Sequence, residues 1–439
     1  MARYEPLKTP HDVLESGATL DGRAKLSEPG RKRWTDAAKR WGGWAVAAVL
    51  VLHTMRSGAG RFRSGEEACW DPFHALGYIH RPANGSIRWI PYPPSFSSAS
   101  SLAQPAAIDG SLDPPPDALR LSAPPYGDML DRIGEEDGMR EMEWARGKRA
   151  VFIGDSHDRS NIEAFCKQHP AAGAELSVPH FHIKAHCRIP SLNLTISSWF
   201  HYGLAPESDS LPSSPSSNTS STLEETGAWY IPNLPTSHPN ENPAPYAVEG
   251  RMKEYWIPDT ETSVDDGGMG GKPDLIVLNS FFWDLRYLAL HARAHPFSRP
   301  SSLRADERPL TLNELEWHRL RVRDFVQLVR ETFPGVPVMF RLGQDYRTTR
   351  NQGNVAVFQL NESLRAILKE LDVPVFEWAR LISGEDRYND DQHLAAGAPA
   401  RLFTDMALFY LRKAVEGRWD VCEKPPSLSP ETRRRRSIR

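Results

Sequence analysis

Ser156 belongs to the segment RAVFIGDSHDRSNIEAF (149–165). A short apolar run ends there at Gly154-Asp155-Ser156, and a helical pattern follows. In an open parallel α/β sheet, ligands bind at the carboxyl ends of the strands. A helix that begins just after Ser156 would offer free backbone N–H groups and a positive dipole end to a developing oxyanion. The position therefore predicts a nucleophilic serine. The alternative is an ordinary helix N-cap.

A serine hydroxyl at neutral pH needs a base that is itself oriented by a third group. The best candidate base lies in RYNDDQHLAAGAPARLF (387–403), where Asp390 and His393 are three residues apart. A helix that starts there would place both side chains on one face, so the carboxylate could fix the tautomer of His393 while the other ring nitrogen faces Ser156. Asp391 is an adjacent alternative. Each motif is common alone, so the prediction depends on their conjunction.

The elements that must position these residues form an alternating pattern from Arg149 onwards. Short apolar runs indicate strands, and the stretches between the later ones indicate amphipathic helices. The candidate strands are 150–154, 275–280, 336–342 and 373–378. Continuous apolar strands separated by amphipathic helices are typical of a parallel sheet covered on both faces. The sequence therefore predicts an α/β fold with three layers, α/β/α.

Two helices are predicted with defined starts. The first covers 311–335, where Thr311 and Glu314 have capping-box spacing and Pro334-Gly335 ends the pattern. The second covers 361–371, and Asn361 is predicted to be its N-cap.

GDSHDR followed far downstream by DDQH resembles the SGNH/GDSL hydrolase superfamily. More narrowly, the chain resembles the PC-esterase branch, which includes the plant trichome-birefringence-like polysaccharide O-acetyltransferases and the sialate O-acetyltransferases. Arg159 matches the G-D-S-x-x-R pattern of this branch, and PDLIVLNSFFWD (273–284) matches its strand ending in Asn279 with Trp283 four residues later. The resemblance implies a parallel, flavodoxin-like sheet.

The resemblance also implies roles for individual residues. Ser156 would be the nucleophile, His393 the base and Asp390 the group that orients it. Arg159 and Asn279 would help to bind the oxyanion beside the Ser156 amide. Oxyanion or substrate binding is further predicted for Gly203 in WFHYGL (199–204), Asp155 and Trp283.

Two departures separate this chain from the plant members of the branch. Phe281 and Phe282 replace the Gly and His that follow their Asn-Ser/Thr, and the cysteines that flank their D-x-x-H are missing. A different acceptor pocket is therefore expected. The overall pattern, including FTDMALFYL (403–411), is similar to that of fungal members.

The predicted reaction is acyl transfer, in particular acetyl transfer, to hydroxyls of a glycan or polysaccharide through an acyl-enzyme. One alternative is an esterase with the same three residues, and another is a non-catalytic glycan-binding protein that keeps the fold. No cofactor is expected, and acetyl-CoA is one candidate acyl donor. With a net charge of -3, the chain is not expected to bind nucleic acid.

PHFHIKAHC (179–187) groups three histidines and a cysteine, which is a pattern that could bind a metal. No carboxylate pattern accompanies these residues, and the predicted serine chemistry needs no metal. A plain strand, with Cys187 in a disulfide, is therefore the preferred interpretation.

WGGWAVAAVLVLHTM (41–55) carries no formal charge and follows five basic residues between 31 and 40. As a helix it spans roughly 22 Å at about 1.5 Å per residue, less than the bilayer core of about 30 Å. Basic residues on the N-terminal side favour a signal anchor with a cytosolic tail, and a buried helix and a cleaved signal peptide are the alternatives. The resulting prediction is a single-pass type II membrane protein of the Golgi or secretory pathway with a lumenal catalytic domain.

This prediction divides the chain into a cytosolic tail (1–40), an anchor (41–55), a Pro/Ser-rich stem (56–140), a catalytic domain (141–420) with a disordered insertion (205–248), and a basic tail (421–439). Four N-x-S/T sequons fit a lumenal body, although Asn361 has the competing cap role. The four cysteines permit two disulfides, and their spacing leaves the pairing open.

Overall fold

The computed structural model describes residues 70–81, 87–92, 114, 116–180, 183–206, 245–294, 308–346, 353–384, 393 and 397–420. The predicted cytosolic tail, anchor and basic tail lie outside these residues, as does most of the predicted insertion. Within the described ranges, every helix is too short or too polar to cross a membrane.

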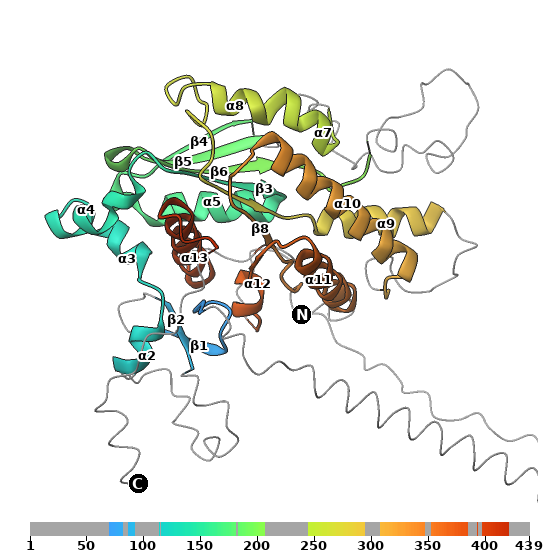
Figure 1. Cartoon of the computed structure of the whole chain (residues 1–439), viewed down its shortest axis with the longest axis horizontal. Helices are drawn as coiled ribbons and strands as arrows, with labels where there is room; N and C mark the ends of the chain where they lie inside the picture. The colour runs from blue at the N-terminus through green and yellow to red at the C-terminus, as the bar shows by residue number, and fades with distance from the viewer. Residues whose placement is uncertain are drawn as a thin grey trace, which may run out of the picture. The chain divides into compact units, whose positions relative to one another are not determined.

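A seven-stranded sheet forms the middle layer of the fold (Figure 1). Its strands are β3 (Arg149–Gly154), β4 (Glu175–His180), β5 (Lys184–Ile189), β6 (Leu194–Phe200), β7 (Leu275–Leu278), β8 (Val338–Arg341) and β9 (Val375–Phe376). The spatial order is β4-β5-β6-β3-β7-β8-β9, and the last five strands are parallel to one another. Numbered along the chain, these five have the order 2-1-3-4-5, which is the flavodoxin-like arrangement. The predicted parallel sheet is confirmed for this part.

The other edge of the sheet differs from the prediction. PHFHIKAHC (179–187) contributes to two antiparallel strands, β4 and β5, instead of one plain strand, and β5 is antiparallel to β6. Strand β6, in which every residue is buried, was not predicted from the sequence. Its Thr195, Ser197 and Ser198 interrupt the apolar pattern, so the segment does not read as a buried strand.

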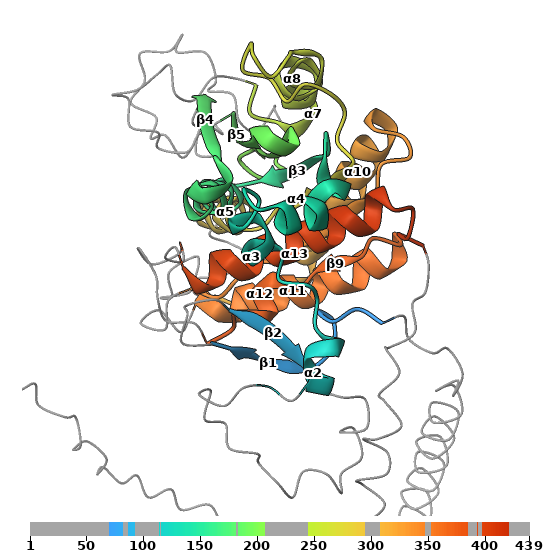
Figure 2. The ribbon, with the colours of Figure 1, turned by 90° about the vertical axis from the view of Figure 1, so that its left-hand side faces the viewer.

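Helices cover both faces of the sheet, which confirms the three layers (Figures 1 and 2). One face of the sheet carries Val151 and Ile153 of β3. The elements that pack against it are α7 (Val248–Arg251), a π-helical turn (Met252–Trp256), α9 (Phe282–Ala294), α10 (Leu312–Thr332) and α11 (Gly353–Glu370). Helix α8 (Ile257–Glu261) continues from the π-helical turn. The opposite face carries Ala150 and Phe152, and it packs against α5 (Ser156–Gln168), α12 (Trp378–Leu381) and α13 (Ala398–Val415).

The described part of the predicted stem is packed onto this domain. It forms the hairpin β1 (Gly77–His80) and β2 (Arg88–Pro91) and the helices α2 (Pro116–Leu121), α3 (Tyr126–Asp131) and α4 (Glu136–Met142). Phe73 and Leu130 lie in the same hydrophobic cluster as α13. The Tyr410 hydroxyl donates to Asp71 Oδ2 (2.9 Å), and the His74 ring bonds the Val375 carbonyl. The domain boundary predicted at residue 141 therefore falls inside α4.

The two predicted helices exist, but only one begins where expected. Thr311 and Glu314 form the capping box at the start of α10. Asn361, by contrast, lies in the middle of α11, which begins eight residues earlier at Gly353. Its side chain exchanges hydrogen bonds with both backbone groups of Gly343, so the predicted N-cap is wrong.

A disulfide joins Cys166 of α5 to Cys187 of β5, with Cα atoms 5.4 Å apart. This confirms the expectation of a disulfide at Cys187. Because it links the helix that begins at Ser156 to the sheet, it restrains the position of that helix. Cys69 and Cys422 lie outside the described residues.

Candidate active site

Ser156 is the first residue of α5, and only Asp155 separates it from the carboxyl end of β3. Strand β3 lies between β6 and β7. The chain that follows β3 first adds strands on the β6 side of the sheet and later adds strands on the β7 side, so Ser156 is at the topological switch point. Its side chain is half-buried, whereas Asp155 and His157 on either side are buried. The turn thus places the partly exposed hydroxyl at the carboxyl ends of the parallel strands and at the N-terminus of α5.

The turn at Ser156 is held by a capping box. Asp155 accepts from the His157 N–H (2.9 Å) and from the Asp158 N–H, and the Asp158 carboxylate accepts from the Asp155 N–H (3.3 Å). A Cβ atom at residue 154 would overlap the Asp158 carboxylate, so Gly154 is needed for this close approach. The G-D-S sequence is therefore explained by local geometry as well as by chemistry.

A buried arginine fixes the turn from a second strand. Arg341, the last residue of β8, donates from Nε and Nη2 to the two Asp158 carboxylate oxygens at 2.7 and 2.8 Å. It also lies 3.8 Å from Asp155. Burial alone would raise the pKa of Asp155, but electrostatic attraction and hydrogen bonding from His157, together with Arg341, hold that pKa well below its ordinary value. Asp155 is therefore a carboxylate at neutral pH.

His393 lies beside Ser156, as the two motifs predict. The distance from its Nε2 to the Ser156 Oγ is 2.8 Å, across 237 residues of sequence. The helix expected to begin near Asp390 begins instead at Ala398, after Gly397 with a φ of 120°. Asp390 and Asp391 lie outside the described residues, so the orienting role of either stays a prediction.

The ring of His393 belongs to a stack with two further rings, those of His157 and Phe282. The His157 ring stacks on the His393 ring at 4.5 Å with an interplanar angle of 20°, and on the Phe282 ring at 4.3 Å and 26°. His157 Nδ1 also lies 3.0 Å from an Asp155 carboxylate oxygen. Phe282 is one of the two phenylalanines that depart from the plant pattern, and here it contacts the residue that follows the serine.

Asn279 follows β7 and lies directly beside the turn. Its backbone N–H donates to the Ile153 carbonyl (2.8 Å), and its side-chain Nδ2 donates to the Arg341 carbonyl (2.8 Å). The His201 ring bonds its carbonyl, also at 2.8 Å. These contacts fix Asn279 at the same edge of the sheet as Ser156. A role in oxyanion binding stays a prediction.

The remaining predicted site residues have these positions. Arg159, one turn after Ser156, packs over the Phe200 ring, 5.5 Å from its centroid. Gly203 has a φ of 89°, and a Cβ there would be 2.7 Å from Asp284; its N–H donates to the His201 ring (3.0 Å). Trp283 packs edge-on against Tyr202, with ring centroids 4.9 Å apart. None of these contacts tests the substrate-binding roles.

Arg341 and His157 were not predicted from the sequence as parts of the site. The Arg341 signal was present as an arginine at the carboxyl end of an apolar strand, where a charge is unexpected unless it is paired. The His157 signal was only its place next to the serine.

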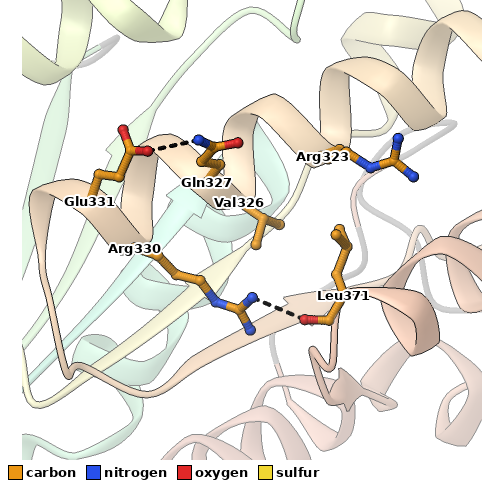
Figure 3. Close-up of a pocket in the computed structure, with 6 residues that line it drawn as sticks. All are labelled: Arg323, Val326, Gln327, Arg330, Glu331 and Leu371. Carbon is orange, nitrogen blue, oxygen red and sulfur yellow. Dashed lines mark hydrogen bonds between the residues drawn. The ribbon is translucent and has the colours of Figure 1, made fainter.

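A surface hollow of about 390 Å³ lies elsewhere (Figure 3). Its lining residues are Arg323, Val326, Gln327, Arg330, Glu331 and Leu371. The end of α10 leads into the amino end of β8. The hollow therefore lies toward the amino ends of the parallel strands, whereas Ser156 lies at their carboxyl ends. Arg330 donates to the carbonyls of Leu371 and Asp372 at 2.9 and 3.0 Å, which joins α10 to the turn after α11. We assign this hollow no part in the chemistry.

No group of three or more His, Cys, Asp or Glu side chains in the described ranges is arranged to hold a metal. His186, from the cluster weighed as a metal site, bonds to Ser197 at 2.8 Å, and Cys187 is in the disulfide. His182 and the side chain of His180 lie outside the described residues.

No family model matches the sequence, and no curated protein matches it either. A candidate GDSL-like lipase from Parabacteroides merdae matches among solved structures, with 12% identity and a TM-score of 0.25. The match covers 62% of this chain and 96% of that one. At these values the likeness carries no argument, and membership of the PC-esterase branch stays a prediction.

Proposed function

We propose that this protein cleaves esters through an acyl-enzyme on Ser156, with His393 as the general base. The observation that carries the proposal is the 2.8 Å separation between Ser156 Oγ and His393 Nε2 at the switch point of a flavodoxin-like sheet. As Oγ attacks the acyl carbonyl, its proton passes to Nε2. His393 then gives this proton to the departing alcohol, which leaves the acyl group on Ser156.

The first turn of α5 supports this proposal because one backbone donor is left for the oxyanion. The N–H groups of His157 and Asp158 donate to the Asp155 side chain, and that of Arg159 donates to the Asp155 carbonyl. The Ser156 N–H takes part in none of these bonds. We assign it as the donor to the carbonyl oxygen of the attacked ester, because an N–H at the positive end of a helix stabilises a tetrahedral intermediate.

Transfer of the acyl group to a glycan hydroxyl is the finer form of this proposal. Water and a sugar hydroxyl would use the same Ser156 and His393, and the difference lies in how well the closed site excludes water. Supply of an acetyl donor to a panel of glycans, and the reverse assay on the acetylated panel, separate a transferase from an esterase. Net acetylation would favour the transferase, and release of acetate alone would favour the esterase.

Labelling with a fluorophosphonate serine probe tests the shared chemistry. Wild type is expected to be labelled, and Ser156→Ala and His393→Ala are expected to lose the label. Ser197→Ala is the matched control because Ser197 also bonds a histidine at 2.8 Å but is fully buried. Equal labelling of wild type and Ser156→Ala would overturn the proposal, and no labelling of either protein would favour a non-catalytic glycan-binding protein.

A further inference from the structure

We propose that His157 is a positioning residue that holds the ring of His393 in the plane needed to take the Ser156 proton. This inference rests on the proposed function, because it gives His157 a task only if His393 is the base. The geometry on which it stands is the stack of Phe282, His157 and His393 beside Ser156.

His157 is itself fixed from two directions. Its backbone belongs to the first turn of α5, and its Nδ1 is hydrogen-bonded to Asp155 at 3.0 Å. The Phe282 ring, at the start of α9, contacts it at 4.3 Å. With only 3% of its surface exposed, the ring is well packed. A side chain held in this way is a rigid surface for a neighbouring ring.

A stacked neighbour restricts the rotation that matters for proton transfer. The His393 Nε2 reaches Ser156 only within a narrow range of ring orientations, since a hydrogen bond weakens steeply as its angle falls. Contact with the flat face of His157 at an angle of 20° excludes orientations that tilt the ring out of that range. His157 is thus suited to orient His393 by contact with the face of the His393 ring. The predicted Asp390 or Asp391 would act on the Nδ1 atom of the same ring.

The charges around the stack determine how pH should reveal this role. Asp155 is a carboxylate hydrogen-bonded to His157, Asp158 pairs with Arg341 from β8, and Arg159 follows on the same helix. Replacement of His157 by Phe removes the imidazole that is hydrogen-bonded to the Asp155 carboxylate. Asp155 keeps Arg341 at 3.8 Å but loses the imidazole, so its negative charge favours the protonated form of His393 more strongly. The acid limb of the kcat/KM profile should therefore move to higher pH.

Hydrolysis of p-nitrophenyl acetate by the full chain tests the inference, with wild type and Ser156→Ala run beside the His157 variants. For His157→Ala we expect kcat to fall by roughly 10- to 100-fold with KM changed by less than about three-fold, because orientation is lost and binding is kept. His157→Phe, which keeps a flat ring, should recover most of kcat. Its acid limb should lie about half a pH unit or more above that of wild type.

Three outcomes would overturn the inference. His157→Ala could have the kcat and pH profile of wild type, or a folded His157→Phe could lose as much kcat as His157→Ala. Should His157→Ala fail to fold, an acid limb for His157→Phe that coincides with that of wild type would also refute it. These results leave Ser156 as the nucleophile. If wild type hydrolyses the ester no faster than Ser156→Ala, the proposed function itself fails and this inference falls with it.

Discussion

Two serine–histidine pairs in this molecule have the same separation and lie in different surroundings. Ser156 Oγ is 2.8 Å from the Nε2 of His393, and Ser197 Oγ is 2.8 Å from the Nδ1 of His186. The second pair even has a carboxylate, since Asp259 lies 3.4 Å from His186 Nε2. Residue types and distances alone would make both pairs catalytic candidates.

The positions of the two pairs in the fold separate them. Ser197 and His186 are directly paired across the antiparallel strands β6 and β5, and both are buried. Asp259 also accepts from the Trp199 indole (2.8 Å) and pairs with Lys184, so the group joins α8 to the sheet. Ser156 is half-exposed at a strand end, where a helix begins. A reactive serine needs access and an oxyanion donor in addition to a base.

The largest expected effect is on the hydrolysis of p-nitrophenyl acetate. Ser156→Ala should lower kcat/KM by roughly 10³-fold or more, because it removes the nucleophile. Ser197→Ala should leave kcat/KM within about two-fold of wild type, with a lower melting temperature as its visible effect, since a buried hydrogen bond is lost. A large rate loss in Ser197→Ala with the melting temperature unchanged would break the comparison.

Arg341→Met should cost the most stability. It leaves the buried Asp158 carboxylate without its charged partner, and removal of one member of a buried ion pair destabilises a protein by about 3–5 kcal/mol. Urea denaturation measures this loss. The exposed pair of Arg140 and Asp137 is the control, and Arg140→Met should change the free energy of unfolding by less than about 1 kcal/mol. Similar losses in the two variants would contradict the role given to Arg341.

Asp405 should make stability fall as pH rises. Burial, opposed in part by the hydrogen bond from the Gly127 N–H and aided by Asp128, raises its pKa from 3.8 to about 7. Because the folded-state pKa is above the unfolded value, the favourable contribution is complete below about pH 4 and is lost as the pH rises through 7. At about 1.36 kcal/mol per pKa unit the loss is at most about 4 kcal/mol.

Asp405→Asn keeps an acceptor for the Gly127 N–H and cannot ionise. The variant should therefore be more stable than wild type at pH 8 and close to it at pH 4, as measured by urea denaturation at the two pH values. Equal stability differences at both pH values would show that Asp405 does not titrate in this range.

Asp259 should show the opposite dependence on pH, with a smaller effect. Burial alone would raise its pKa, but hydrogen bonds and charge from His186 and Lys184 lower it below the ordinary value. Its contribution is therefore present above about pH 4 and is lost as the pH falls through the folded-state pKa. Asp259→Asn should cost about 2 kcal/mol at pH 7 and less at lower pH.

The rate constant for ester hydrolysis by folded Asp259→Asn should stay near that of wild type. A rate loss equal to that of Ser156→Ala would mean that the buried pair, and not Ser156 with His393, does the chemistry.

The sequence predicts the pair of Ser156 and His393 better than the residues that support this pair. Ser156 and His393 were found because each belongs to a short motif, and α10 because its cap and apolar face are local. Arg341 contacts Asp158 across 183 residues and from a strand two places away in the sheet, which no local pattern records. The stack of His157 depends equally on the relative placement of distant segments.

The same limit explains the errors in the fold. The parallel strands β3, β7 and β8 are continuous apolar runs, and each was predicted. Strand β6 was missed because polar residues interrupt its apolar pattern, and the sequence does not reveal the partner of one of them, His186 for Ser197. The start of α13 was predicted too early. The small residues before Gly397 fit a helical pattern in the sequence, but the φ of 120° at Gly397 is not a helical value, and α13 begins after it.

Trapping of the acyl-enzyme tests the central claim most directly. Wild type and His393→Ala would be mixed with p-nitrophenyl acetate, quenched in acid during turnover, digested and analysed by mass spectrometry. We predict an acetyl group on the peptide that contains Ser156 in wild type and its loss in His393→Ala. An acetyl group on another serine, or the same occupancy of Ser156 in both proteins, would contradict the account.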